Sequence, residues 1–70
     1  MKAPHYLMQF FKYAHLPENM QAISKLFYDL AKKLDDDLLP DCENGNPEKT
    51  MALRKLLEAK DCAVRSLIYK

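Results

Sequence analysis

The 70-residue chain has one glycine, two cysteines and no tryptophan, and it contains no long apolar run. A single glycine cannot build the glycine-rich loop that cradles phosphate groups in many nucleotide-binding enzymes. Two cysteines form at most one bridge, so a disulfide framework is excluded. No apolar stretch approaches the roughly 18 residues that a transmembrane helix needs. The sequence therefore predicts one small globular domain that neither spans a membrane nor depends on a disulfide scaffold.

The charges of the chain nearly cancel, because eleven basic residues stand against ten acidic ones for a net charge of +1. Proteins that track DNA or RNA carry a strong basic excess, which is absent here. The acids cluster in the middle of the chain, and much of the basic charge flanks them, which leaves room for a local basic pocket. The acidic run 35–37 lacks the spacing of a calcium loop, so we expect it to be a solvated helix end.

The chain is too short to bury a large core, because a domain of this size hides only about 60% of its unfolded surface. Domains this small gain stability from disulfides, metals or self-association. Cys42 and Cys62 match no zinc-ligand spacing with His5 and His15, and we expect free thiols in a reducing compartment. The N-terminal residues lack the apolar core of a secretory signal. These features predict a cytoplasmic homo-oligomer with no metal and no cofactor.

Apolar residues recur at helical spacing on both sides of one strong break, the proline- and glycine-containing segment 38–46. The upstream pattern predicts a helix over 17–37, and the acids at its end oppose the helix dipole, so its last turn is expected to fray. The downstream pattern predicts a helix over 47–69, with Asn46 as N-cap and Pro47 in the first turn. Two such helices joined by a short loop form an antiparallel hairpin.

The first residues predict a further, short helix over about 4–14, because apolar side chains follow Pro4 at helical spacing. It is expected to end at a corner before Pro17, since the residue before a proline is pushed out of the helical region. The predicted fold class is therefore all-α. A single domain over 1–70 combines this short helix with the antiparallel hairpin of two long helices, and it is oligomeric.

Lys60 is the most unusual residue of the downstream helix, because it lies seven residues after Leu53 and four before Val64, in the middle of the apolar face. A lysine there needs an acid, an anionic ligand or a route for its stem to solvent. One interpretation is a lysine that snorkels outward or pairs with an acid of a partner chain. The other is an anion contact within a subunit interface, and the sequence leaves both open.

Arg54 and Arg65 lie on a charged stripe beside that apolar face. Each is four residues from an acid, Glu58 and Asp61 respectively, which is the spacing of helix ion pairs. Most such stripes are solvated surface and contribute little to stability. The alternative is that an arginine here grips a phosphate or a base edge with its planar guanidinium.

Tyr13 is the aromatic residue whose surroundings best suit a ligand. It sits at the predicted corner between Lys12 and His15, and an aromatic ring beside cations is what a nucleobase with a phosphate needs. Tyr28 lies on the flank of the upstream helix, near Lys25, and is a second candidate. For both tyrosines the alternative is simple packing against the core.

The sequence offers no catalytic signature. Cysteine-based catalysis needs a base beside the thiol, and neither Cys42 nor Cys62 has one in a recognisable local motif. The glycine count already excludes a phosphate-cradling loop. We therefore expect a binding protein and not an enzyme.

Two segments resemble motifs of a group of small phage proteins. The stretch 47–67, PEKTMALRKLLEAKDCAVRSL, resembles the last helix of that group: an acid, Ser or Thr, Ala-Leu, Leu, an acid, Ala and a small apolar end. The segment 13–17, YAHLP, resembles its first motif, an aromatic corner of the form Tyr-Arg-x-Leu followed by a helix. The group is the helical-hairpin family that includes the anti-CBASS cyclic-oligonucleotide sponges of the anti-CBASS protein two type. The resemblance covers roughly residues 10–68.

This resemblance implies a specific function. The sponges of the family are compact helical proteins assembled as hexamers. They bind the cyclic di- and trinucleotide signals of bacterial antiviral defence and hold them intact, so that the effectors are not activated. The resemblance thus implies a bacteriophage immune-evasion protein that acts by sequestration in the cytoplasm of the infected bacterium.

The family's ligand contacts can be carried over to part of this chain. In the family, the corner aromatic stacks on a base, and by resemblance this residue is Tyr13. A lysine on the first long helix meets phosphate. Lys25 is the nearest match, although the strict register falls near Phe27 or Tyr28.

Other positions depart from the family pattern. Ala14 replaces the arginine after the corner aromatic, which leaves Lys12 or His15 to supply positive charge, while Arg65 matches a basic position late in the last helix. These departures leave the preferred cyclic nucleotide open. The candidate ligand-binding residues are Lys12, Tyr13, His15, Lys25, Tyr28, Arg54, Lys60 and Arg65.

Two other functions compete with sequestration. A small helical module could inhibit or adapt a host protein through its apolar face, and an exposed apolar stripe would mark it. A nucleic-acid-binding protein would show a steep salt dependence of binding, which the charge balance disfavours, so no DNA partner is expected.

Overall fold

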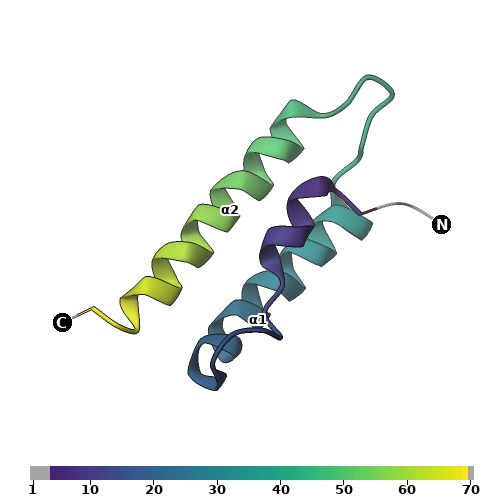
Figure 1. Cartoon of the computed structure of the whole chain (residues 1–70). Coiled ribbons are helices and arrows are strands. Elements are labelled where there is room, and N and C mark those ends of the chain that lie inside the picture. The colour runs from purple at the N-terminus through teal and green to yellow at the C-terminus, as the bar shows by residue number, and fades with distance from the viewer. Residues whose placement is uncertain (1–3, 70) are drawn as a thin grey trace.

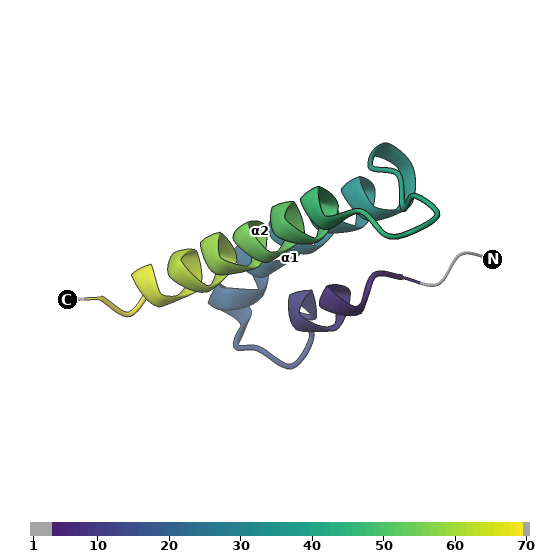
Figure 2. The same ribbon diagram turned by 90° about the horizontal axis from the view of Figure 1, so that it is seen from above.

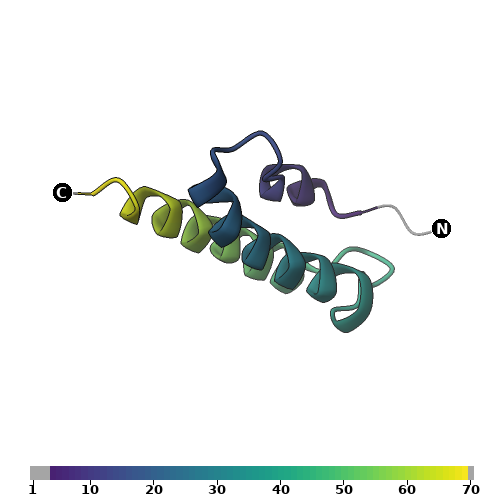
Figure 3. The same cartoon turned by 90° about the horizontal axis from the view of Figure 1, so that it is seen from below.

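The computed structural model of the chain describes residues 4–69, a range that is mostly helical and contains no β-strand. Two long helices, α1 (Glu18–Lys33) and α2 (Pro47–Ser66), pack side by side and are joined at one end by a loop (Figure 1). A short 3-10 helix, η1 (Tyr6–Phe11), lies against one face of this pair, as the views from above (Figure 2) and below (Figure 3) show. The all-helical fold class is confirmed.

The start of α2 follows the local signal in the sequence. The Asn46 side chain accepts a hydrogen bond from the backbone N–H of Lys49 at 3.1 Å, and Pro47 occupies the first turn. The same Asn46 side chain donates to the carbonyl of Pro40 at 2.8 Å, so it caps the helix and closes the loop. Gly45, with a φ of 89°, supplies the left-handed backbone that the loop needs just before the cap.

The core of the described chain contains five buried apolar side chains, and η1 supplies three of them. These five are Leu7, Met8, Phe11, Ala31 and Leu53. Phe11 and Leu53 are fully enclosed. Partly buried side chains of both long helices pack around this set. The short helix is therefore part of the core, and its position relative to α1 is fixed by packing.

The helix boundaries differ from the sequence-based ones in three places. The short helix spans Tyr6–Phe11 instead of about 4–14, because His5 caps it and Lys12 is already extended. The upstream helix does not fray over 17–37: α1 continues through a π-helical turn, η2 (Leu34–Leu38). The loop therefore begins at residue 39. The backbone N–H of Leu39 closes the π-helical turn on the carbonyl of Leu34 at 2.8 Å.

The downstream helix is shorter than the predicted 47–69. It ends at Ser66, where the backbone tightens into 3-10-type hydrogen bonds, from Leu67 N to the Val64 carbonyl and from Ile68 N to the Arg65 carbonyl, both at 3.1 Å. Bonds of this kind satisfy the last carbonyls of a helix and end it. Within residues 4–69, the chain has no helix of the length and apolarity that a bilayer crossing requires.

Candidate functional site

Tyr13, in the segment between η1 and α1, meets Tyr28 of α1. The rings of Tyr13 and Tyr28 lie 5.5 Å apart, edge to face, with an interplanar angle of 65°. The Tyr13 carbonyl accepts a hydrogen bond from Leu16 N at 3.0 Å, and the Gln21 side chain donates to the carbonyls of Leu16 at 2.7 Å and Ala14 at 3.3 Å. The corner is thus tied to the first turns of α1, and Tyr13 is held in place beside Tyr28.

Two lysines of α1 form ion pairs on the surface of the helix. The Lys25 amine donates to Asp29 and the Lys32 amine donates to Asp36, both at 2.7 Å on the surface of α1. The hydrogen bond to Asp29 raises the pKa of Lys25 above 10.5, with a smaller contribution from Tyr13. The bond to Asp36 likewise raises the pKa of Lys32, with a smaller contribution from Tyr28. Both amines are therefore charged at neutral pH.

A hollow of about 740 Å³ opens between η1 and the helix α1–η2. Ligand sites in proteins commonly measure about 300–1,000 Å³, so the hollow is large enough for a nucleotide. Its lining comprises Pro4, His5, Tyr6, Met8, Gln9, Lys12, Tyr28, Lys32, Asp35 and Asp36. Lys12 makes no ion pair with any residue between 4 and 69. Of the candidates from sequence, Lys12 and Tyr28 line this hollow and Tyr13 contacts Tyr28. Lys25 does not line it and pairs with Asp29 on the surface of α1.

The remaining candidates lie outside this group. Arg54 donates to the hydroxyl of Tyr6 at 3.5 Å and borders a separate, shallower hollow at the start of α2. Arg65 donates to the sulfur of Cys62 at 3.2 Å near the end of α2. His15 is exposed in the turn after Tyr13. Arg54 therefore contacts η1 and Arg65 contacts its own helix, and neither bond involves the tyrosine pair.

Lys60 is buried, and its amine is used inside the chain. It donates to the carbonyl of Phe10 at 3.0 Å and lies 3.1 Å from the carboxylate of Asp61. The bond to Phe10 joins α2 to the end of η1, directly before Lys12 and Tyr13. This arrangement favours a structural role for Lys60, since an anion would have to displace the Phe10 carbonyl and Asp61.

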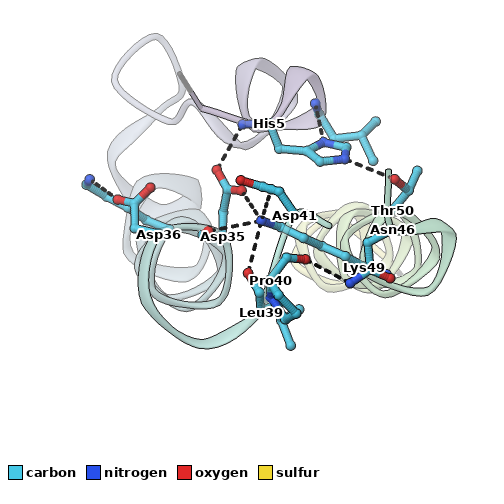
Figure 4. Close-up of polar contacts among 11 residues, drawn as sticks. His5, Asp35, Asp36, Leu39, Pro40, Asp41, Asn46, Lys49 and Thr50 are labelled. Atoms are coloured by element: carbon cyan, nitrogen blue, oxygen red, sulfur yellow. Dashed lines mark hydrogen bonds and ion pairs between the residues drawn. The ribbon is translucent and has the colours of Figure 1, made fainter. Parts of the chain in front are cut away.

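A buried ion pair beside the hollow was not predicted from the sequence. The prediction of a solvated acidic run at 35–37 is wrong for Asp35, whose side chain and that of Lys49 are each 1% exposed and pair at 2.8 Å. Figure 4 shows the Lys49 amine at the centre of a cluster in which it also contacts the carbonyls of Asp35 and Leu39 and the carboxylate of Asp41. The pair needs both helices, so a reading of local patterns misses it.

His5 connects this cluster to η1. Its backbone N–H donates to Asp35 at 2.9 Å, its Nδ1 accepts from Leu7 N at 3.1 Å, and its Nε2 lies 3.1 Å from the Thr50 hydroxyl (Figure 4). The cluster therefore fixes the start of η1 against η2 and α2, and with it one end of the hollow. One sequence signal could have pointed to it: Lys49 lies in the first turn of α2, where a cation is unfavourable unless it has a partner.

No group of three or more potential metal ligands occurs among the described residues. Comparisons of the chain with protein-family models, with curated proteins and with solved structures find no significant match.

Proposed function

We propose that the protein binds and sequesters cyclic di- or trinucleotide immune signals without cleaving them, and so blocks CBASS-type effector activation. It acts as a phage anti-defence protein in the cytoplasm of the infected bacterium. The observation that carries the proposal is the contact between Tyr13 and Tyr28 at a hollow that Lys12, Tyr28 and Lys32 line.

The composition of this cluster suits a cyclic dinucleotide, which has two bases and two phosphates. An aromatic side chain stacked on a base contributes about 1–3 kcal/mol of binding energy. Lysine amines bind phosphate as point charges. Lys25 and Lys32 are held by exposed carboxylates, and exposed ion pairs contribute only about 0–1 kcal/mol. Transfer of the amines from these carboxylates to a phosphate therefore costs little free energy.

We further propose that the two long helices act as an antiparallel hairpin that assembles into a homo-oligomer, a hexamer by the family resemblance. Leu26 and Leu30 are 70% and 48% exposed on α1, and apolar surface of this kind supports self-association. A symmetric interface supplies each of its residues twice. Such an interface near Tyr13 would match the near-twofold symmetry of a cyclic dinucleotide.

The exposed apolar residues also favour a second function, a module that binds a host protein. Leu26 on α1 and Ile68 after α2 are both more than half exposed. A module of this kind needs neither the tyrosine pair nor the lysines. It predicts no effect of any cyclic nucleotide on the stability of the protein.

Thermal unfolding tests the proposal. The purified protein is melted alone and with cyclic di-GMP, cyclic di-AMP or cyclic tri-AMP. A ligand at a hundred times its dissociation constant adds about 2.7 kcal/mol of stability and raises the melting temperature. Ligand recovered after denaturation should be chemically unchanged, and a cleaved product would identify an enzyme instead.

Two tyrosine variants serve as a matched pair for this experiment. Tyr13→Ala should abolish the ligand-induced shift, while Tyr69→Ala, which removes an 86% exposed ring beyond the end of α2, should leave it unchanged. Equal shifts in both variants would remove the stacking role of Tyr13. A melting temperature that no cyclic nucleotide changes would rule out sequestration and favour the protein-binding module.

A further inference from the structure

The hollow between η1 and α1–η2 has two different ends. At one end, His5 and Asp35 are joined by a hydrogen bond of 2.9 Å. At the other, Lys12 and Tyr28 line the hollow, next to the Tyr13–Tyr28 ring contact. We call the His5–Asp35 side the acidic end of the hollow and the Lys12–Tyr28 side the aromatic end.

The chain's register orders the side chains along this hollow. Tyr28, Lys32 and Asp36 are spaced by four residues, which places them one above the other on one side of the helix. Lys32 thus lies between the aromatic end and the acidic end, and Lys12 and Gln9 come from the facing η1 side. A base has the Tyr28 ring available at the aromatic end, and a phosphate has the amines of Lys12 and Lys32 in the same lining.

The two carboxylates at the acidic end are not equivalent. Asp35 is fully buried, paired with Lys49 and bonded to His5 N. The Asp36 side chain is 37% exposed and is paired with Lys32 at 2.7 Å, and Figure 4 shows it pointing away from Lys49. If a phosphate takes the Lys32 amine, both oxygens of Asp36 become available as acceptors at that end of the hollow.

We propose that this hollow selects guanine among the bases of a cyclic dinucleotide, with Asp36 accepting from the base edge while Lys32 and Lys12 contact a phosphate. The inference rests on the proposed function and adds a base preference to it. Asp36 is then a specificity-determining residue, and the Lys32–Asp36 ion pair is exchanged for two ligand contacts.

The hydrogen-bond donors and acceptors on each base determine which base Asp36 favours. An ionised carboxylate only accepts hydrogen bonds, and it has two oxygens side by side. The Watson–Crick edge of guanine offers two adjacent donors, the ring N1–H and the exocyclic amino group. Adenine and cytosine offer one amino donor next to a ring nitrogen acceptor, and uracil has one donor between two carbonyls. Guanine is therefore the base that meets a carboxylate without placing an acceptor against it.

The test compares the affinities for cyclic di-GMP and cyclic di-AMP by isothermal titration calorimetry. The wild-type protein should bind cyclic di-GMP at least about tenfold more tightly, which corresponds to about 1.4 kcal/mol. In Asp36→Asn this ratio should fall toward one, because the amide presents a donor where a second acceptor is needed. Asp37→Asn is the matched control: Asp37 pairs with Lys33 at the same spacing but does not line the hollow.

The outcomes separate this inference from the proposed function. Binding of both ligands with equal affinity, or a guanine preference that Asp36→Asn leaves intact, would overturn the role of Asp36 while sequestration stands. A loss of preference in Asp37→Asn equal to that in Asp36→Asn would also overturn it, by showing a general charge effect. Failure of the wild-type protein to bind either ligand, with cyclic tri-AMP also inactive, would overturn both.

Discussion

Asp35 and Lys49 form a 2.8 Å ion pair in which both side chains are almost fully enclosed by the protein. The pair joins η2 to the first turn of α2, and the His5 N–H on Asp35 adds the start of η1. Three elements far apart in the sequence thus meet at one charge pair. Because η1 forms one side of the candidate ligand hollow, the pair also fixes one end of that hollow relative to α2.

Replacement of one partner should destabilise the protein strongly. Lys49→Met leaves the Asp35 carboxylate buried without its cation, and breaking a buried pair in this way costs about 3–5 kcal/mol. That is a large part of the stability of a domain of this size, which is about 0.05–0.15 kcal/mol per residue. Urea unfolding followed by circular dichroism measures the loss.

The control for this prediction is Lys33→Met, which breaks an exposed pair with Asp37 and should cost no more than about 1 kcal/mol. The double variant Asp35→Leu/Lys49→Met should recover part of the stability lost by Lys49→Met, because it removes both buried charges. Equal losses in Lys49→Met and Lys33→Met would show that burial gives the Asp35 pair no special importance.

Structural features that depend only on neighbouring residues can be predicted from the sequence. Asn46 and Pro47 start α2 by contacts within a few residues, so a local pattern is enough. Asp35 and Lys49 lie 14 residues apart on separate elements, and their pairing depends on how the helices pack. The same holds for the hollow, because Lys12 and Lys32 become neighbours only after η1 folds against α1.

The cap of α2 gives a second prediction. Asn46→Ala removes the acceptor for Lys49 N and the donor to the Pro40 carbonyl, and loss of such a cap costs about 0.5–2 kcal/mol. Asn44→Ala, in the exposed loop two residues earlier, should change stability by no more than about 0.5 kcal/mol. Urea unfolding of both variants gives the comparison, and similar losses in the two would contradict the capping role of Asn46.

A Lys60 variant can show whether this buried lysine stabilises the fold or contacts an anionic ligand. Lys60→Met keeps most of the buried stem but removes the donor to the Phe10 carbonyl, so we expect a loss of about 1.5–3 kcal/mol, as for a hydrogen bond to a charged group. The affinity of the remaining folded protein for cyclic di-GMP should be unchanged. Lys55→Met, at an exposed position on the same helix, controls for the loss of a positive charge. A drop in affinity of tenfold or more in Lys60→Met alone would make Lys60 an anion contact.

The dependence of ligand binding on pH follows from the two lysines beside the tyrosine pair. Hydrogen bonds to Asp29 and Asp36 raise the pKa of Lys25 and of Lys32 above 10.5. A raised pKa means that the amine keeps its proton to higher pH, so the positive charge is complete below 10.5 and is lost only as the pH rises through the raised pKa. The affinity for cyclic di-GMP should therefore stay constant from neutral pH to about pH 8, measured by calorimetry at fixed ionic strength. A loss of affinity between about pH 6 and pH 8 would instead assign the phosphate contact to a histidine, which changes charge in that range; His15, next to the corner, would then be the residue to replace.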